Sequence, residues 1–195
     1  MNYEKRFTSV ALKSRWRETL RRWLIAGLRY AAHTAAARDG RVLNPTPLLR
    51  HFDYSIRKAH PIEFSALGGL IVNVYASLPV MPGVADQPDY YAVLRDVAKR
   101  ANNPANSVFI ATSKLGGLLG SVDFISDMKH YGVRGAASTI SNAAGIRYLA
   151  VKTDFRGNGI GRSLTAYCVD RAREFGKSAI ILHTTRPMAT AWAMY

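Results

Sequence analysis

The sequence predicts an α/β fold, and the clearest support lies in residues 144–185. An apolar run alternates up to Leu149–Val151, and a glycine-rich turn at Arg156–Gly161 follows it. Leu164, Cys168 and Ala172 then recur at helical spacing, Gly176 ends that helix, and Ser178–Leu182 is a short β-branched strand. On the first strand, the alternation puts Ile146, Tyr148 and Ala150 on one face and Leu149 and Val151 on the other.

The glycine-rich turn has the features of an anion-binding site. Glycines at 157, 159 and 161 remove the Cβ atoms that would keep a ligand away from the backbone. The first N–H groups of the following helix have no intrahelical acceptor, and the helix dipole is positive there, which suits a pyrophosphate. Arg156 and Arg162 add positive charge on either side. The Gly-x-Gly-x-Gly spacing fits neither a dinucleotide-binding fold nor a P-loop.

Length and composition indicate one globular domain of ordinary hydrophobic content. The single cysteine, Cys168, excludes a disulfide framework and favours a reducing compartment, the cytoplasm. Cys168 lies on the apolar face of its helix with no evident base nearby, so we expect a buried thiol and not a nucleophile. No apolar run reaches the length of a membrane span, and no spacing of His, Cys, Asp and Glu resembles a metal site.

Positive charge is concentrated at the N-terminus. Residues 1–53 hold eleven Lys and Arg against four Asp and Glu, in a chain of net charge +14. This shift predicts a basic helical extension and linker over residues 1–50, followed by a domain over residues 51–195. Ala11–Ala37 is predicted as one amphipathic helix with tryptophans on one face and arginines on the other. Three interpretations stay open for this helix: packing on the domain or on a partner subunit, binding to an anionic membrane surface or nucleic acid, or poor order.

The segment between the extension and the turn predicts two further helices, three strands and a loop. The periodicity gives a strand at Tyr54–Ala59, helices at Ile62–Leu78 and Gln87–Ala101, a hairpin of Ser107–Thr112 with Leu118–Ile125, and a glycine-rich loop at Ser126–Ala143.

Arg-Gly-x-Gly-Ile-Gly after a strand with Leu-Ala-Val resembles the acetyl-CoA-binding motif of the GNAT acetyltransferases. The similarity continues through Leu182–Thr185 and into Met188–Tyr195, which resembles the family's fourth helix. The resemblance implies a mixed central sheet flanked by helices, here with the C-terminal strands missing because the sequence stops at Tyr195. It also implies that the backbone of Leu149, Ala150 and Val151 pairs with the pantetheine arm of acetyl-CoA. The pyrophosphate would lie on the turn formed by Arg156, Gly157, Asn158, Gly159, Ile160, Gly161 and Arg162.

The activity that the resemblance implies is transfer of an acetyl group from acetyl-CoA to an amine, by direct attack in a ternary complex. The family's leaving-group acid corresponds to Tyr195. For the base, His183 has a suitable pKa and ends a strand, Asp123 and Asp127 lie on or just after another strand, and a water relay would serve equally. The acceptor, a small-molecule or protein amine, is left open, as is a homodimer.

Two non-catalytic functions also fit the sequence. One is a truncated relative that only binds coenzyme A. The other is a basic adaptor whose helix at residues 11–37 binds nucleic acid or a membrane surface. Of these, only the adaptor has a function that does not depend on the glycine-rich turn.

Overall fold

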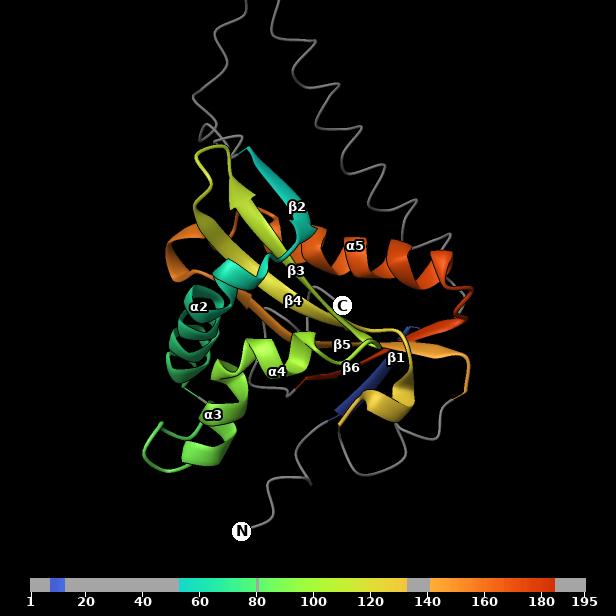
Figure 1. Cartoon of the computed structure of the whole chain (residues 1–195), viewed down its shortest axis with the longest axis horizontal. Coiled ribbons are helices and arrows are strands. Elements are labelled where there is room, and N and C mark those ends of the chain that lie inside the picture. The colour runs from blue at the N-terminus through green and yellow to red at the C-terminus, as the bar shows by residue number, and fades with distance from the viewer. Residues whose placement is uncertain (1–7, 13–52, 80, 133–140, 185–195) are drawn as a thin grey trace, which may run out of the picture.

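A computed structural model describes residues 8–12, 53–79, 81–132 and 141–184, and it contains one six-stranded sheet with helices on both faces (Figure 1). The strand order is β1-β6-β5-β4-β3-β2. β5 and β6 are parallel and every other neighbouring pair is antiparallel, so the sheet is mixed, as predicted. The strands are β1 (Thr8–Leu12), β2 (Tyr54–Lys58), β3 (Asn106–Ser113), β4 (Leu118–Ile125), β5 (Ala143–Val151) and β6 (Ala179–Thr184).

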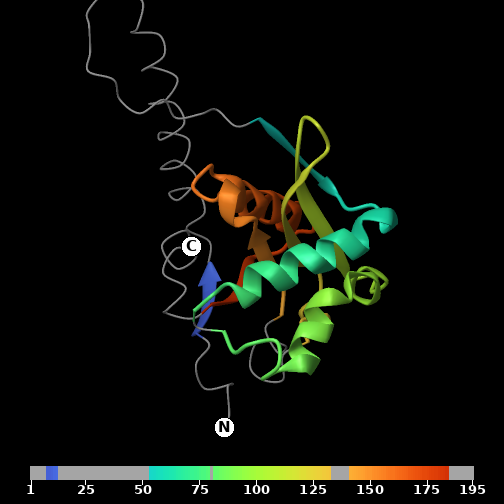
Figure 2. The ribbon, with the colours of Figure 1, turned by 90° about the vertical axis from the view of Figure 1, so that its left-hand side faces the viewer.

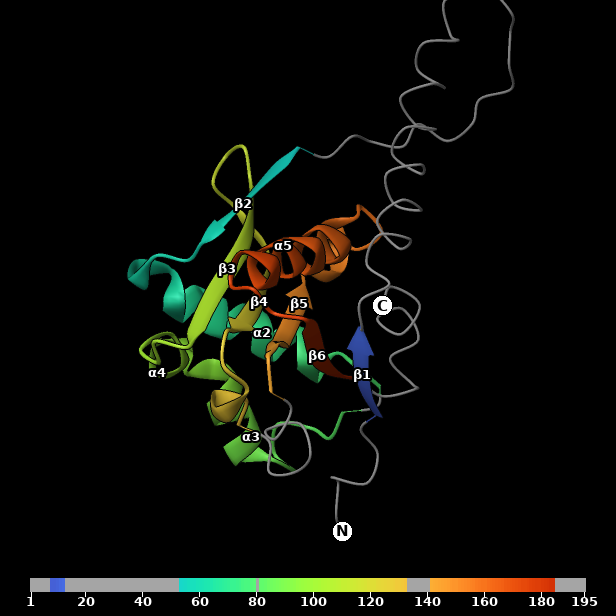
Figure 3. The ribbon, with the colours of Figure 1, turned by 90° about the vertical axis from the view of Figure 1, so that its right-hand side faces the viewer.

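The helices cover the two faces of the sheet unequally. Helix α5 packs on one face, and α2, α3 and α4 pack on the other (Figures 2 and 3). Their bounds are α2 (Phe64–Ala76), α3 (Pro88–Arg95), α4 (Val97–Ala101) and α5 (Ile160–Glu174), with short 3-10 helices η3 (Pro61–Glu63), η4 (Met128–His130) and η6 (Thr153–Phe155). Among the residues described, no helix is both long and apolar enough to cross a membrane.

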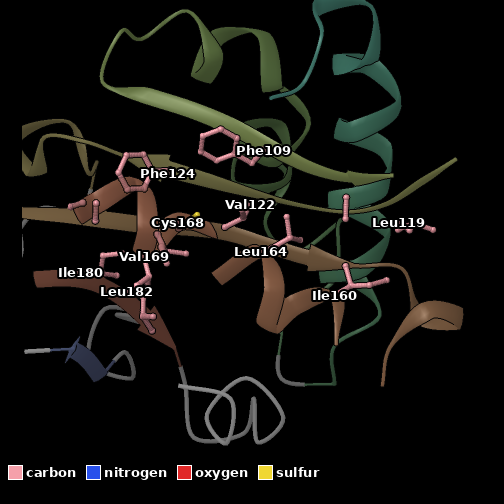
Figure 4. Close-up of a cluster of buried hydrophobic side chains, with 14 residues drawn as sticks. Phe109, Leu119, Val122, Phe124, Ile160, Leu164, Cys168, Val169, Ile180 and Leu182 are labelled. Atoms are coloured by element: carbon pink, nitrogen blue, oxygen red, sulfur yellow. The ribbon is translucent and has the colours of Figure 1, made fainter. Parts of the chain in front are cut away.

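The core beneath α5 consists of apolar side chains from the helix and the central strands (Figure 4). Leu164 and Cys168 of α5 lie against Val122, Phe124 and other strand residues, and all are almost fully buried. Burial also raises the pKa of the Cys168 thiol, which is therefore protonated. Cys168 is thus a core residue, as the sequence indicates.

A second apolar core lies on the opposite face. Leu67 and Ile71 of α2 and Leu94 of α3 pack there against Ile110 and Tyr148 of the sheet. A smaller cluster next to it joins η4 and its flanks to the ends of β4, β5 and β6, through Ile125, Met128, Tyr131, Ala143 and Ile181.

Two helix predictions need correction. Gln87–Ala101 is not one helix but two, because Asp96 leaves the helical region at ψ 71°. The Asp96 carboxylate accepts a hydrogen bond from the Lys99 N–H at 2.9 Å and caps α4. The predicted helix at 11–37 is wrong at its start, since Ala11 and Leu12 belong to β1. The rest of that helix, residues 13–37, lies outside the described residues.

The prediction of which β5 side chains share a face of the sheet is also wrong beyond Ile146. Ile146 packs beneath α5, as Leu149 and Val151 do, whereas Tyr148 and Ala150 pack on the α2 side. The cause is a β-bulge: the register with β4 shifts between Ser121 and Asp123, and Tyr148 has a φ of +53°. An extra residue in one strand moves all later side chains to the other face.

β1 occupies the sheet position next to β6. It pairs antiparallel with β6, from Thr8 opposite Thr184 to Leu12 opposite Ile180. β6 is therefore an interior strand, with β5 on one side and the N-terminal β1 on the other.

Two adjacent glycines in α2 make a matched test of the packing between α2 and α3. A Cβ on Gly68 would lie 2.3 Å from the Arg95 carbonyl oxygen, whereas a Cβ on Gly69 would meet nothing within 4 Å. We expect Gly68→Ala to lower the free energy of unfolding by about 1–3 kcal/mol, because backbone atoms must separate. Gly69→Ala should raise it by about 0.5–1 kcal/mol, the usual gain in a helix. Urea unfolding measures both, and an equal effect of the two would contradict the close helix contact.

Candidate functional site

β5 and β6 pair over only the first half of β5. The parallel pairing runs from Ala143 opposite Ala179 to Ile146 opposite Leu182. β5 then continues to Val151 with its other edge still paired to β4, where Gly120 is opposite Val151. Along residues 147–151, the edge of β5 that points away from β4 pairs with no described residue of β6. The backbone polar groups of this edge are able to pair with an extended ligand that carries amides.

The bulge at Tyr148 lies where the strands separate. Its positive φ is uncommon for a residue with a bulky side chain, so the surrounding structure has to hold it. The Tyr148 ring is buried, and the guanidinium groups of Arg100 and Arg147 lie 4.6 Å and 4.5 Å from its centroid. These cation–π contacts keep the bulge in one conformation.

The glycine-rich turn leads from η6 into α5 and exposes its backbone. Gly157 and Gly159 have φ values of +82° and +78°, which favour glycine, and Gly159 is the N-cap of α5. A Cβ on Gly157 would meet nothing within 4 Å, and one on Gly159 only the Tyr54 hydroxyl at 3.9 Å. The turn is therefore open to a ligand, and its backbone conformation favours glycine at both positions.

Side chains of the turn hold its shape and leave the helix N-terminus available. Asn158 Nδ2 donates to the carbonyl oxygens of Phe155 and Arg156, at 3.1 and 3.3 Å, and Arg156 Nε donates to that of Val151 at 3.3 Å. Ile160 is buried and anchors the first turn of α5, whereas Arg162 on the same turn is exposed. The N–H groups of this turn lack intrahelical acceptors, so two arginines and a helix N-terminus converge on one exposed surface.

Tyr54 and Ser163 also belong to this surface, although sequence reasoning missed both. The Tyr54 hydroxyl lies 2.7 Å from Ser163 Oγ and joins the start of β2 to the first turn of α5. No local motif marks this contact, because it spans more than a hundred residues of chain.

His183 lies at the end of β6, next to the point where the strands separate. Its Nδ1 is 2.9 Å from the Tyr131 hydroxyl, which donates its proton to the Ile146 carbonyl oxygen at 3.2 Å. In the tautomer that agrees with this direction, His183 Nδ1–H donates to the tyrosine oxygen and Nε2 holds the imidazole lone pair. Burial, and secondarily the charge of Arg147, lower the pKa of His183, so the ring is neutral at pH 7.

Tyr131 fits against the sheet because residue 145 is glycine. A Cβ on Gly145 would lie 2.4 and 2.5 Å from Cδ2 and Cε2 of the Tyr131 ring. Arg147 Nη1 donates to the Tyr131 carbonyl oxygen at 2.7 Å. Tyr131 thus contacts His183, Gly145 and Arg147. The sequence contains one signal for this group: Gly145 lies inside a strand, and such a glycine often marks a place where another part of the protein packs closely against the backbone.

The two aspartate candidates occupy different positions. Asp123 is completely buried, accepting from Arg100 Nε and Asn106 Nδ2, both at 2.9 Å. Burial raises the pKa of Asp123, against the opposing effect of Arg100. Asp127 instead caps η4 by accepting from the Lys129 N–H at 3.0 Å. Tyr195, the predicted acid, lies outside the described residues.

Among the residues that the structure describes, no group of three or more His, Cys, Asp or Glu side chains could hold a metal ion.

Comparison with known proteins gives one family. The chain matches the model of the acetyltransferase (GNAT) family over residues 73–195. No curated protein sequence matches it. A GNAT-family acetyltransferase structure from Staphylococcus aureus Mu50 has a TM-score of 0.57 at 17% identity, covering 73% of this chain and 81% of that one.

Two further solved structures have the same fold. A GCN5-related N-acetyltransferase from Ralstonia eutropha JMP134 has a TM-score of 0.56 at 14% identity, over 72% of this chain and 90% of that one. yncA, a putative acetyltransferase from Salmonella typhimurium solved with acetyl-CoA, has a TM-score of 0.50 at 14% identity, over 73% and 76%. With the family match over most of the chain, these similarities confirm the resemblance seen at the glycine-rich turn: the chain belongs to the GNAT family of acetyltransferases.

Proposed function

We propose that this protein is an N-acetyltransferase that moves the acetyl group of acetyl-CoA to an amine by direct attack in a ternary complex. The observation that supports this best is the separation of β5 from β6 next to the glycine-rich turn. An extended backbone edge and an anion site, side by side, match the two parts of acetyl-CoA: an amide-bearing arm and a pyrophosphate.

The donor lies along β5 in this proposal. The backbone of Leu149, Ala150 and Val151 pairs with the pantetheine arm, and backbone N–H groups of this strand polarise the thioester carbonyl. The pyrophosphate binds the turn, with donors from the backbone and from two arginines: Arg156, Gly157, Asn158, Gly159, Ile160, Gly161 and Arg162. Apart from the buried Ile160, these residues are exposed or partly exposed, which fits a ligand of this charge.

The reaction needs a neutral amine. The amine nitrogen attacks the thioester carbonyl carbon, the C–N bond forms, and the C–S bond then breaks to release the thiolate. His183 Nε2 takes the proton that the attacking nitrogen loses, which its neutral state allows. Tyr195 is the proposed proton source for the thiolate on the resemblance alone. Asp123 is unsuited as the base, because its carboxylate is buried in an ion pair with Arg100.

The first prediction concerns binding of acetyl-CoA. At about 100 times the Kd, binding should add ~2.7 kcal/mol to the free energy of unfolding, which raises the melting temperature by several degrees. Gly159→Glu should abolish this rise, because it puts a carboxylate on the pyrophosphate site. Thermal shift with and without acetyl-CoA measures both.

The control for this variant is Gly116→Glu in the β3–β4 turn. Gly116 has a φ of +79°, nearly that of Gly159, and open space around it, so both variants bear the same backbone strain. Only Gly159→Glu should lose the shift. A folded wild type without any shift would refute the proposed function.

The second prediction concerns pH. A base must be neutral to act, and the pKa of His183 is lowered, so the acidic limb of kcat/KM should have its midpoint below about 6.5, the ordinary value for histidine. His183→Ala should lower kcat/KM by about 100- to 10,000-fold, the usual contribution of a general base, and remove that limb. Initial rates of thiol release between pH 5 and 9 measure it.

His130→Ala is the matched control for the loss of a histidine. His130 is exposed and its Nδ1 lies 3.2 Å from Asn103 Nδ2, away from the β5–β6 separation. It should keep both the rate and the acidic limb. An unchanged pH profile in His183→Ala would rule out His183 as the base and leave a water relay.

A further inference from the structure

Arg147 is a cation held in place where β5 leaves β6. It is half-buried, and Nη1 donates to the Tyr131 carbonyl oxygen at 2.7 Å. Its guanidinium carbon lies 4.5 Å from the centroid of the Tyr148 ring and 5.4 Å from that of Tyr131. A hydrogen bond and two aromatic rings thus fix the position of a side chain that is usually mobile.

Within the part of the chain that the structure describes, Arg147 has no ion-pair partner. Asp123 is its register partner on β4, but that carboxylate pairs with Arg100 and Asn106. Across the described ranges, 8–12, 53–79, 81–132 and 141–184, no carboxylate makes an ion pair with Arg147. Two arginines therefore share one carboxylate. A half-buried guanidinium with five N–H donors, one of them given to Tyr131, has the remaining donors for an anion.

We infer that Arg147 binds an anionic group, a carboxylate or a phosphate, on the amine that accepts the acetyl group. This inference rests on the proposed function, because it assigns the substrate class of the same site. A flat guanidinium matches both anions with two parallel hydrogen bonds.

Tyr131 sets the size of such an acceptor. Its hydroxyl contacts His183 Nδ1, and its carbonyl oxygen accepts from Arg147. The proposed base and the proposed anion anchor thus both touch one residue on one face of the sheet. His183 and Arg147 are then separated by no more than a tyrosine and two hydrogen bonds, of 2.9 and 2.7 Å, which suits a small molecule such as an amino acid or an aminoalkyl phosphate.

The experiment compares pairs of amines that differ only in the anion. The carboxylate arm uses an α-amino acid against its amide, and the phosphate arm uses 2-aminoethyl phosphate against 2-aminoethanol, with rates corrected for the fraction of neutral amine. We expect kcat/KM to be about 10- to 100-fold higher for the anionic member of at least one pair, the effect of one charge-assisted contact. The arm that responds identifies the anion.

Variants of Arg147 connect that preference to the side chain. Arg147→Gln should lower kcat/KM for the preferred anionic amine by about 10- to 100-fold more than for its neutral partner, and mostly through KM. The kcat/KM of Arg147→Lys should lie between those of the wild type and Arg147→Gln, because lysine keeps the charge but cannot donate two parallel hydrogen bonds. Arg171→Gln, which removes an arginine that pairs with Glu174 at the far end of α5, should change neither. Circular dichroism melts confirm that each variant folds.

Three results would overturn the inference. The wild type could fail to distinguish the members of either pair, or Arg147→Gln could lower kcat/KM equally for both members. Weaker acetyl-CoA binding by Arg147→Gln would instead place Arg147 in the donor site. If Arg147→Gln does not fold, the wild-type pairs decide alone. A protein that binds no acetyl-CoA refutes the proposed function instead. Calorimetric titration of the same amine pairs, without turnover, then tests the anion site by the same preference.

Discussion

The separation of β5 from β6 is the feature on which the rest of the site depends, and the β-bulge at Tyr148 lies where it begins. The two strands stay paired only to Ile146, and the bulge then turns the following side chains to the other face. β5 stays paired with β4, and β6 stays paired with β1. Each strand therefore keeps one paired edge where β5 and β6 separate. Without the bulge, Tyr148 would face α5 and not the cluster under α2.

The buried ion pair of Asp123 and Arg100 helps to hold the bulge at Tyr148 in place. Arg100 is the link, since it pairs with Asp123 of β4, donates to the Leu94 carbonyl oxygen near the end of α3, and lies over the Tyr148 ring. Breaking a buried pair by removing one partner usually costs several kcal/mol, because the other charge remains in a poorly solvated place. Asp123 therefore affects the site by positioning Tyr148. A carboxylate used in this way is unavailable to take a proton from a substrate.

Much of the fold could be predicted from the sequence, because its signals are local. Periodicity gave the β3–β4 hairpin, β2, α2 and the β5–α5–β6 unit, and the glycine spacing indicated the donor site. The errors have physical causes. A bulge inserts one residue without any mark in the apolar pattern, and one polar residue, Asp96, ends α3 by capping α4. β1 was missed because a five-residue strand is specified by its partner, and Leu12 pairs with Ile180 far along the chain.

The two halves of the site differ in how far they can be predicted, and the reason is topological. The proposed donor half is one continuous segment, β5 to α5, so a motif describes it. The proposed acceptor half consists of Tyr131, Arg147 and His183, which lie on three separate segments, and only the fold brings them together. Two physical features mark them: a tyrosine that requires a glycine beneath it, and an arginine held in place with no counter-ion among the described residues. A partly buried charge without a counter-ion has a cost in the free protein, and binding of an acceptor with the opposite charge removes it. The donor site thus follows from local sequence, whereas the acceptor has to be inferred from a charge that has no counter-ion in the part of the chain that the structure describes.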